Sequence, residues 1–302
     1  MSFDEKNVPI PIRFSLFEEI TSRPKWQDGI DLGQHKPTFI IGDYSFSKSE
    51  EIRCGLKHCR RPHMNGYVIE TVDGIETHIG NECGKTHFGV TWGELHAVYR
   101  RAREDRDREE WLVTILGERD SLVKNSQSLL SSVVEITQQI RSVIDRLQKE
   151  PELFSSFMRT IRADGSIQVE KTIDSETGEA MNIPLSQRNF LERIGRIVGL
   201  DVIPRNSTTY PGDQIASSLR VKVIPVFTAL STTSLCNLNP RQRKNRAKEI
   251  EAAKEILKDA EIYLSKARTF LNPSNLQELG KLPVSKMNQR TGRILKSFSS
   301  EG

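Results

Sequence analysis

The chain has 302 residues, of which 36% are hydrophobic and 28% are charged, and its formal net charge is +4. This composition provides enough apolar residues for a core, and the slight positive charge permits a nucleic-acid partner without requiring one. Four cysteines do not suggest a disulfide framework, and no apolar run is long enough to cross a bilayer. Because the N-terminal residues also lack the pattern of a signal peptide, we expect a cytoplasmic protein without a membrane partner.

The first part of the chain is expected to contain an arm and a small module. Residues 1–35 are partly apolar and are predicted to form an irregular arm that docks on some other surface. Residues 36–44 are rich in β-branched and aromatic side chains, which is typical of a strand. Together with the cysteine- and histidine-rich segment that follows, they form a predicted module over residues 36–90.

A long helix is predicted over residues 91–150. Thr91 is a candidate N-cap, and Pro151 ends the helical pattern. Apolar residues recur at seven-residue intervals in three rows, one of which runs from Ile115 to Val143. Three rows are wider than a two-stranded seam requires, so the helix is expected in a bundle of three or more helices.

The middle of the chain is predicted to hold shorter elements. Residues 152–163 have the pattern of a short helix, and residues 164–184 have that of a β-hairpin. Ser186 can cap a further helix that Gly199 closes. Residues 200–236 are compatible with either strand or helix.

The clearest helix is predicted over residues 240–271, with Asn239 as its N-cap and Pro240 at the first helical position. Its heptads alternate large aliphatic residues with alanine, which lets another helix approach closely. The predicted partner is helix 91–150, in an antiparallel arrangement. Residues 273–302 are basic and short of apolar residues, and are predicted to be partly disordered. The predicted domains are therefore 1–35, 36–90, 91–272 with a hairpin insertion at 164–184, and 273–302.

Cysteines and histidines gather in a short segment that begins at Cys54 and holds three of the four cysteines and four of the six histidines. Cys54 and Cys59 flank a short loop, a predicted hairpin follows, and Cys83 and His87 then stand four residues apart, on one face of a helical turn. Zinc in structural sites takes four thiolate or imidazole ligands. The preferred ligand set for a structural Zn²⁺ is Cys54, Cys59, Cys83 and His87, with His63 as the alternative to His87.

This order of loop ligands, hairpin and helix-borne ligands resembles a treble-clef zinc finger. The resemblance covers residues 54–90 and is one of fold, not of family. Four residues separate the first two cysteines, where that fold usually has two. The resemblance implies a closed structural zinc site, and the alternative without a metal is three buried free cysteines.

A catalytic metal site on the same segment is the enzymatic alternative. Some nucleases hold a metal ion on a β-β-α unit, and His78, Asn81 and His87 stand where the predicted strand passes into the helix. However, the first strand of the hairpin offers no general base, and the chain has no Walker A loop or nucleophile-elbow motif. The sequence therefore favours a protein that is not an enzyme.

Basic residues without intervening acids mark the start of helix 240–271. These cations are Arg241, Arg243, Lys244, Arg246 and Lys248. Cations are unfavourable at a helix N-terminus, whose free N–H groups bind phosphate well, so the run suggests a role other than helix stability. Arg60 and Arg61 could extend the same surface. The functional interpretation is contact with a nucleic-acid backbone, and the alternative is a solvated helix start.

We therefore expect a mostly α, α+β protein in which a small zinc module joins a bundle of long antiparallel helices with a β-hairpin insertion. The first functional hypothesis is a non-enzymatic zinc protein that binds DNA, RNA or a nucleoprotein complex through its basic surfaces. The alternatives are a protein–protein adaptor or inhibitor, such as a phage- or host-encoded regulator, and a metal-dependent HNH-like nuclease. The long helices could also pair with those of a second copy to form a homo-oligomer.

Overall fold

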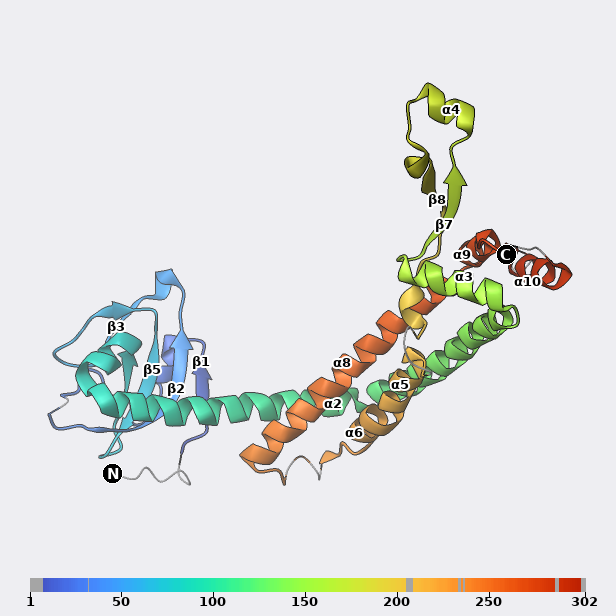
Figure 1. The fold of residues 1–302 in the computed structure, drawn as a ribbon. Coiled ribbons are helices and arrows are strands. Elements are labelled where there is room, and N and C mark those ends of the chain that lie inside the picture. Colours follow the sequence, from blue (N-terminus) through green and yellow to red (C-terminus); the bar gives the residue numbers. More distant parts are fainter. Residues whose placement is uncertain are drawn as a thin grey trace. The chain divides into compact units, whose positions relative to one another are not determined.

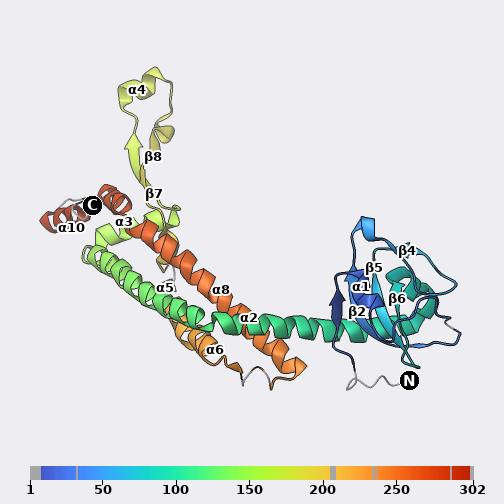
Figure 2. The ribbon, with the colours of Figure 1, turned by 180° about the vertical axis from the view of Figure 1, so that it is seen from behind.

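The structure, a computed structural model, describes residues 8–31, 33–204, 209–232, 235, 237–285 and 288–299 (Figure 1, and Figure 2 from behind). These residues form mainly helices with three small sheets, which confirms the predicted mostly α, α+β class. The chain divides into two compact units. Unit 1 comprises Met1–Leu116 and Leu235–Ala247, and unit 2 comprises Gly117–Ser234 and Lys248–Gly302.

A four-stranded sheet forms the body of unit 1. Its strands, in spatial order, are β1 (Ile12–Phe14), β2 (Pro37–Ser45), β5 (Asn65–Thr71) and β6 (Glu76–Gly80). β1 runs parallel to β2, and the other neighbours are antiparallel. Because side chains alternate between the faces of a strand, one cluster buries Ile69 and Ile79 and a second buries Ile41 and Val68. The strand and the hairpin predicted for this module are confirmed.

The arm that was predicted to be irregular is partly regular in its described residues. Strand β1 adds to the edge of the sheet and buries Phe14, and α1 (Phe17–Thr21) buries Ile20 in the same cluster. The prediction was wrong because three residues are too few to show a strand period, whereas the open edge of β2 supplies their hydrogen-bond partners.

Helix α2 (Asn81–Gln148) follows β6 directly and so begins before the predicted start at Thr91. The backbone angles at Gly89 are φ 52° and ψ −121°, which interrupt the helix and suit a residue without a Cβ atom. The predicted start therefore corresponds to the second part of α2. The first part, before Gly89, carries Cys83.

Helices also dominate the chain after α2. Their bounds are α3 (Pro151–Arg162), α5 (Pro211–Ser218), a π-helical turn (Leu219–Val223), α6 (Ile224–Thr228) and α8 (Pro240–Leu271). The bounds of α8 are those predicted, and the Gln242 N–H donates a 2.9 Å hydrogen bond to Asn239 Oδ1, as expected of an N-cap. The chain widens into the π-helical turn just before Pro225, which has no N–H to continue the α-helical ladder.

The direction of α8 differs from the prediction. In unit 2, Lys254 of α8 pairs with Glu118 of α2, and further along both helices the hydroxyl oxygens of Tyr263 and Thr137 lie 2.9 Å apart. The positions in contact increase together along the two helices, so α8 runs parallel to α2. The predicted antiparallel pairing of these two helices was wrong.

The antiparallel neighbour of α2 in unit 2 is the segment of α5 and α6. Arg119 of α2 donates a hydrogen bond to the Thr228 carbonyl, and Arg141 further along α2 pairs with Asp213, which is earlier in the chain. The α5–α6 segment thus makes the return path, and α8 then runs in the same direction as α2. Heptad spacing cannot reveal this because it reports a buried stripe and not the direction of the helix that covers it.

A β-hairpin separates α3 from α5. Its strands are β7 (Ser166–Thr172) and β8 (Asn189–Arg196), and the connection holds the short helix α4 (Ser175–Ala180). The helix predicted after Ser186 was therefore wrong, and so was the end of the predicted hairpin at residue 184. Residues 190–198 have apolar positions that fit a helical period, but the chain uses them to pair with β7.

The C-terminal segment, which was predicted to be partly disordered, is helical over most of its described residues, and residues 286, 287 and 300–302 of that prediction lie outside the described part of the chain. It forms α9 (Pro273–Glu278), a 3₁₀ turn (Leu279–Lys281) and α10 (Gln289–Ser299). Phe298 is fully buried, and the Arg146 guanidinium lies 4.7 Å from the centre of its ring. A few well-placed apolar side chains therefore suffice to hold this segment. No helix among the described residues combines the length and the apolar character needed to cross a bilayer.

Candidate metal centre

Three cysteines converge in unit 1. Strands β3 (Ile52–Arg53) and β4 (Pro62–His63) pair and close the loop that carries Cys54 and Cys59, while Cys83 lies in the first turn of α2. The three sulfur atoms all lie within 4.8 Å of one another, and the Cys59 and Cys83 sulfurs are 3.3 Å apart. Three ligand atoms at this spacing could hold a metal ion.

The cluster is more buried at two of its thiols than at the third. Burial raises the pKa of the Cys83 thiol to about 12 and raises that of Cys54 as well, although backbone N–H groups donate to the Cys54 sulfur. Burial alone would also raise the pKa of Cys59, but hydrogen bonds from the Arg61 backbone and from the other two thiols lower it. A bound cation would have to displace the protons that the buried thiols keep at neutral pH.

The two predicted histidine ligands lie outside the three-sulfur cluster. His63 Nδ1 is 3.1 Å from the Arg61 carbonyl oxygen, to which it donates, so the neutral ring accepts a hydrogen bond at Nε2 from the Tyr44 hydroxyl, 2.6 Å away. Burial lowers the pKa of His63. His87 is exposed on α2, one helical turn beyond Cys83.

His78, the first histidine of the nuclease alternative, is almost completely buried on β6. Its Nε2 donates a 2.7 Å hydrogen bond to the Arg53 carbonyl, and its Nδ1 has no partner among the described residues. The imidazole ring is stacked with the Trp26 ring, with 6.2 Å between the ring centres, and it contacts the Phe17 ring edge to face. This environment resembles a packed interior and not an open catalytic position.

The cations near the cysteines differ in their availability. Both carboxylate oxygens of Asp28 lie 2.7 Å from Arg60, so the charge of that arginine is neutralised within the unit. Arg61 is exposed and forms no ion pair with a described residue. Of the two arginines, Arg61 is therefore the one with a free charge beside the cysteine loop.

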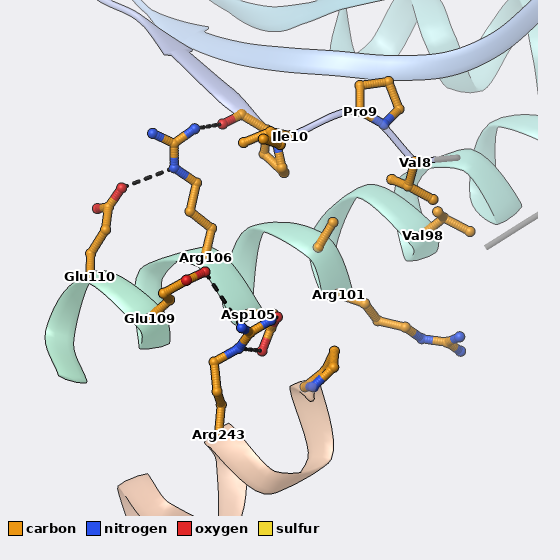
Figure 3. Close-up of a pocket in the computed structure, with 13 residues that line it drawn as sticks. Val8, Pro9, Ile10, Val98, Arg101, Asp105, Arg106, Glu109, Glu110 and Arg243 are labelled. Atoms are coloured by element: carbon orange, nitrogen blue, oxygen red, sulfur yellow. Dashed lines mark hydrogen bonds and ion pairs between the residues drawn. The ribbon is translucent and has the colours of Figure 1, made fainter. Parts of the chain in front are cut away.

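The cations at the start of α8 fall into two groups. Arg243 forms a bidentate pair with Asp105 of α2 and lies 3.6 Å from Glu109 (Figure 3). Arg246 is half-buried. The remaining three are exposed and form no ion pair with the part of the chain that the structure describes: Arg241, Lys244 and Lys248.

A cavity of about 600 Å³ lies in unit 1 between residues 8–11, α2 and the start of α8 (Figure 3). Its charged wall is neutralised internally, because Arg243 pairs with acids of α2, Arg106 pairs with Glu110, and Arg106 also donates to the Pro11 carbonyl. The cavity is therefore lined by apolar side chains such as Val98, and neither Arg106 nor Arg243 presents an unpaired charge to it.

Comparison of the chain with protein-family models, with curated proteins and with solved structures finds no match. The assignment of a metal site therefore depends on the geometry of the three cysteines alone. Sequence reasoning grouped the three cysteines, but it missed the acids that neutralise Arg60 and Arg243. The signal available for Arg243 was the mixed-charge run around Asp105 in a helix that the heptads already placed in a bundle.

Proposed function

We propose that Cys54, Cys59 and Cys83 hold a structural Zn²⁺ in a treble-clef-like module. The support is the convergence of three sulfurs that form no disulfide, two from the loop between β3 and β4 and one from the start of α2, with the β5–β6 hairpin between them in sequence. Thiolate-rich tetrahedral sites favour zinc among the common divalent ions. The metal would join the first turn of α2 to the cysteine loop, at the edge of the core cluster that also buries Ile69 and Ile79.

His87 is the proposed fourth ligand, because it lies on the same helix face as Cys83 and forms no hydrogen bond with a described residue, whereas both nitrogens of His63 are engaged. Replacement of His87 by alanine is expected to weaken zinc binding by about 100-fold or more, because one of the four metal ligands is lost. Chelator competition measures this. His58→Ala is the control on an exposed histidine nearby, and a larger loss in His63→Ala would instead assign the fourth position to His63.

For the whole chain, we infer a non-enzymatic zinc protein that contacts the phosphate backbone of nucleic acid. The observation that carries this proposal is the exposure of Arg241 and Lys244 in the first turns of α8, without an ion pair to a described residue. N–H groups at a helix start add to the attraction for phosphate. Arg243 is excluded from this surface by its pair with Asp105.

Replacement of Arg241 and Lys244 by alanine is expected to weaken nucleic-acid binding and to reduce its salt dependence. On duplex DNA each phosphate contact contributes about 0.9 to the log–log slope of affinity against salt, so the loss of two contacts lowers the slope by about 1.8. Titrations with duplex DNA, single-stranded DNA and RNA across a salt series measure both. Lys258→Ala/Arg268→Ala removes the same two charges from exposed positions further along α8 and serves as the control. Absence of binding at low salt would contradict the proposal.

A protein–protein adaptor is the second candidate, and the hairpin of unit 2 favours it. Six of the thirteen exposed large apolar side chains of the described residues lie between Met181 and Val198. Such clustering is typical of surfaces that contact another protein. The nuclease alternative has less support, because His78 is buried and is hydrogen-bonded to a backbone carbonyl.

A further inference from the structure

The two edges of the β7–β8 hairpin are not equivalent. The sheet has only these two strands among the described residues, so both edges carry unpaired backbone groups (Figure 1). The pairing is interrupted where Ile167 faces Gly195 and Gln168 faces Arg193, which leaves Ile194 as an extra residue in β8. A bulge of this kind disrupts the edge on which it lies and protects it from strand addition. Strand β7 has no extra residue, so its edge is regular.

The residues of β7 suit antiparallel pairing with a second β7. When a two-fold axis passes through Val169, each residue of the seven-residue strand faces a compatible one of the other copy. The four kinds of facing pair are Val169 with Val169, Gln168 with Glu170, Ile167 with Lys171, and Ser166 with Thr172. Amide–carboxylate and hydroxyl pairs can form hydrogen bonds. The Ile167 side chain is fully buried within its own copy, so this position can offer only its backbone to Lys171 of the other copy. No like charges face each other.

Shifts of this register towards the C-terminal end of β7 are less favourable. An axis through Glu170 brings two carboxylates face to face, and an axis through Lys171 does the same for two ammonium groups, which is destabilising. The charge at the far end of the hairpin also favours the antiparallel direction. Residues 172–187 hold three acids, Asp174, Glu176 and Glu179, and no base. Antiparallel pairing places these two acidic ends at opposite ends of the joined sheet, whereas a parallel pairing would bring them together.

We propose that two copies of this chain associate through β7, in antiparallel register about Val169, to form a four-stranded sheet. The hairpin gains stability in this arrangement because a two-stranded ribbon alone is only marginally stable in water. Gln168 and Glu170 are exposed and available for the contact, whereas Lys171 pairs with Glu192 and Thr172 donates a hydrogen bond to Asn189 within the hairpin. This inference is independent of the zinc site and of nucleic-acid binding.

Two substitutions at one position test the register with opposite expected results. Gln168→Glu places a carboxylate opposite Glu170 of the other copy at two symmetric sites, and we expect dimerisation to weaken about tenfold at low salt. Gln168→Lys places an ammonium group there, and we expect it to strengthen by a similar factor. Sedimentation of the full chain from about 1 to 200 µM measures the dissociation constant, a range chosen because a single strand pair is a small interface. Gln187→Glu and Gln187→Lys are the matched controls, since Gln187 is exposed outside β7.

A cross-link locates the axis. Val169→Cys is expected to give a disulfide-linked dimer under mild oxidation, beyond the background of the native cysteines, because the two side chains face each other. Thr172→Cys is expected to give none, because its two copies would be about 20 Å apart along the strands. A chain that stays monomeric throughout overturns the proposal and leaves the β7 edge to a different protein. A dimer that responds equally to both Gln168 variants, or cross-links equally at both cysteines, also overturns it and points to the long helices.

Discussion

Replacement of Cys83 by serine is expected to abolish stoichiometric zinc binding and to unfold unit 1. Cys83 is the only one of the three clustered cysteines that lies on α2, so its loss separates the helix start from the loop of Cys54 and Cys59. Structural zinc contributes about 10–16 kcal/mol of apparent binding free energy in small zinc modules. That amount is comparable with the whole stability of a typical domain, about 5–15 kcal/mol. Zinc analysis and circular dichroism, before and after a strong chelator, measure the two effects.

A control on the same helical turn separates metal loss from local damage. Lys85→Ala removes an exposed side chain from the first part of α2, and this variant should keep its zinc and its thermal midpoint. If the cysteines are instead free and buried, Cys83→Ser lowers the stability of unit 1 only through the burial of one hydroxyl group. The chelator then leaves the circular dichroism of the native chain unchanged. Retention of both zinc and the native midpoint in Cys83→Ser would rule out the proposed centre.

Replacement of Gly212 by valine is expected to destabilise unit 2 by about 3 kcal/mol. A Cβ atom at this position of α5 would lie 2.0 Å from Thr137 Oγ1 and 2.4 Å from the Tyr263 hydroxyl oxygen. Thr137 and Tyr263 are themselves buried and hydrogen-bonded to each other between α2 and α8. Neither can move without separating the three helices, so the strain reaches the centre of the bundle.

Gly117→Ala provides the opposite case on α2. A Cβ atom there meets nothing within 4 Å, so this variant is expected to gain about 0.5–1 kcal/mol from the lower backbone entropy of the unfolded chain. Urea unfolding of both variants gives the difference in free energy. Equal midpoints for Gly212→Val and the native chain would mean that α5 does not pack between α2 and α8 as described.

Several features followed from local chemistry and were therefore accessible to prediction. The bounds of α8 depend on Asn239 as cap, on Pro240 at the first position and on the heptads between them. The hairpin of β5 and β6 depends on alternation around a glycine turn. The grouping of the three cysteines depends on their order relative to that hairpin and to the helix start. Each of these signals acts over a few residues.

The corrected predictions concern contacts between distant segments. Residues 189–196 have apolar positions that fit a helix, and only the pairing with β7 makes them a strand. Arg243 stood in a run of cations, but the bundle places it against Asp105. The parallel direction of α8 depends on the return path through α5 and α6, which no periodicity reports.

The sequence by itself determined the mostly α class, the cysteine group and the capped helix α8, because propensity, capping and hydrophobic period act within one element. The tertiary structure alone decided which charges are neutralised, which way α8 runs and which hairpin edge remains regular. Those properties depend on pairings across many residues of chain, such as Arg243 with Asp105 and Tyr263 with Thr137. The free energy of such a pairing depends on both segments at once. It therefore cannot be read from either segment alone and becomes known only from the folded structure.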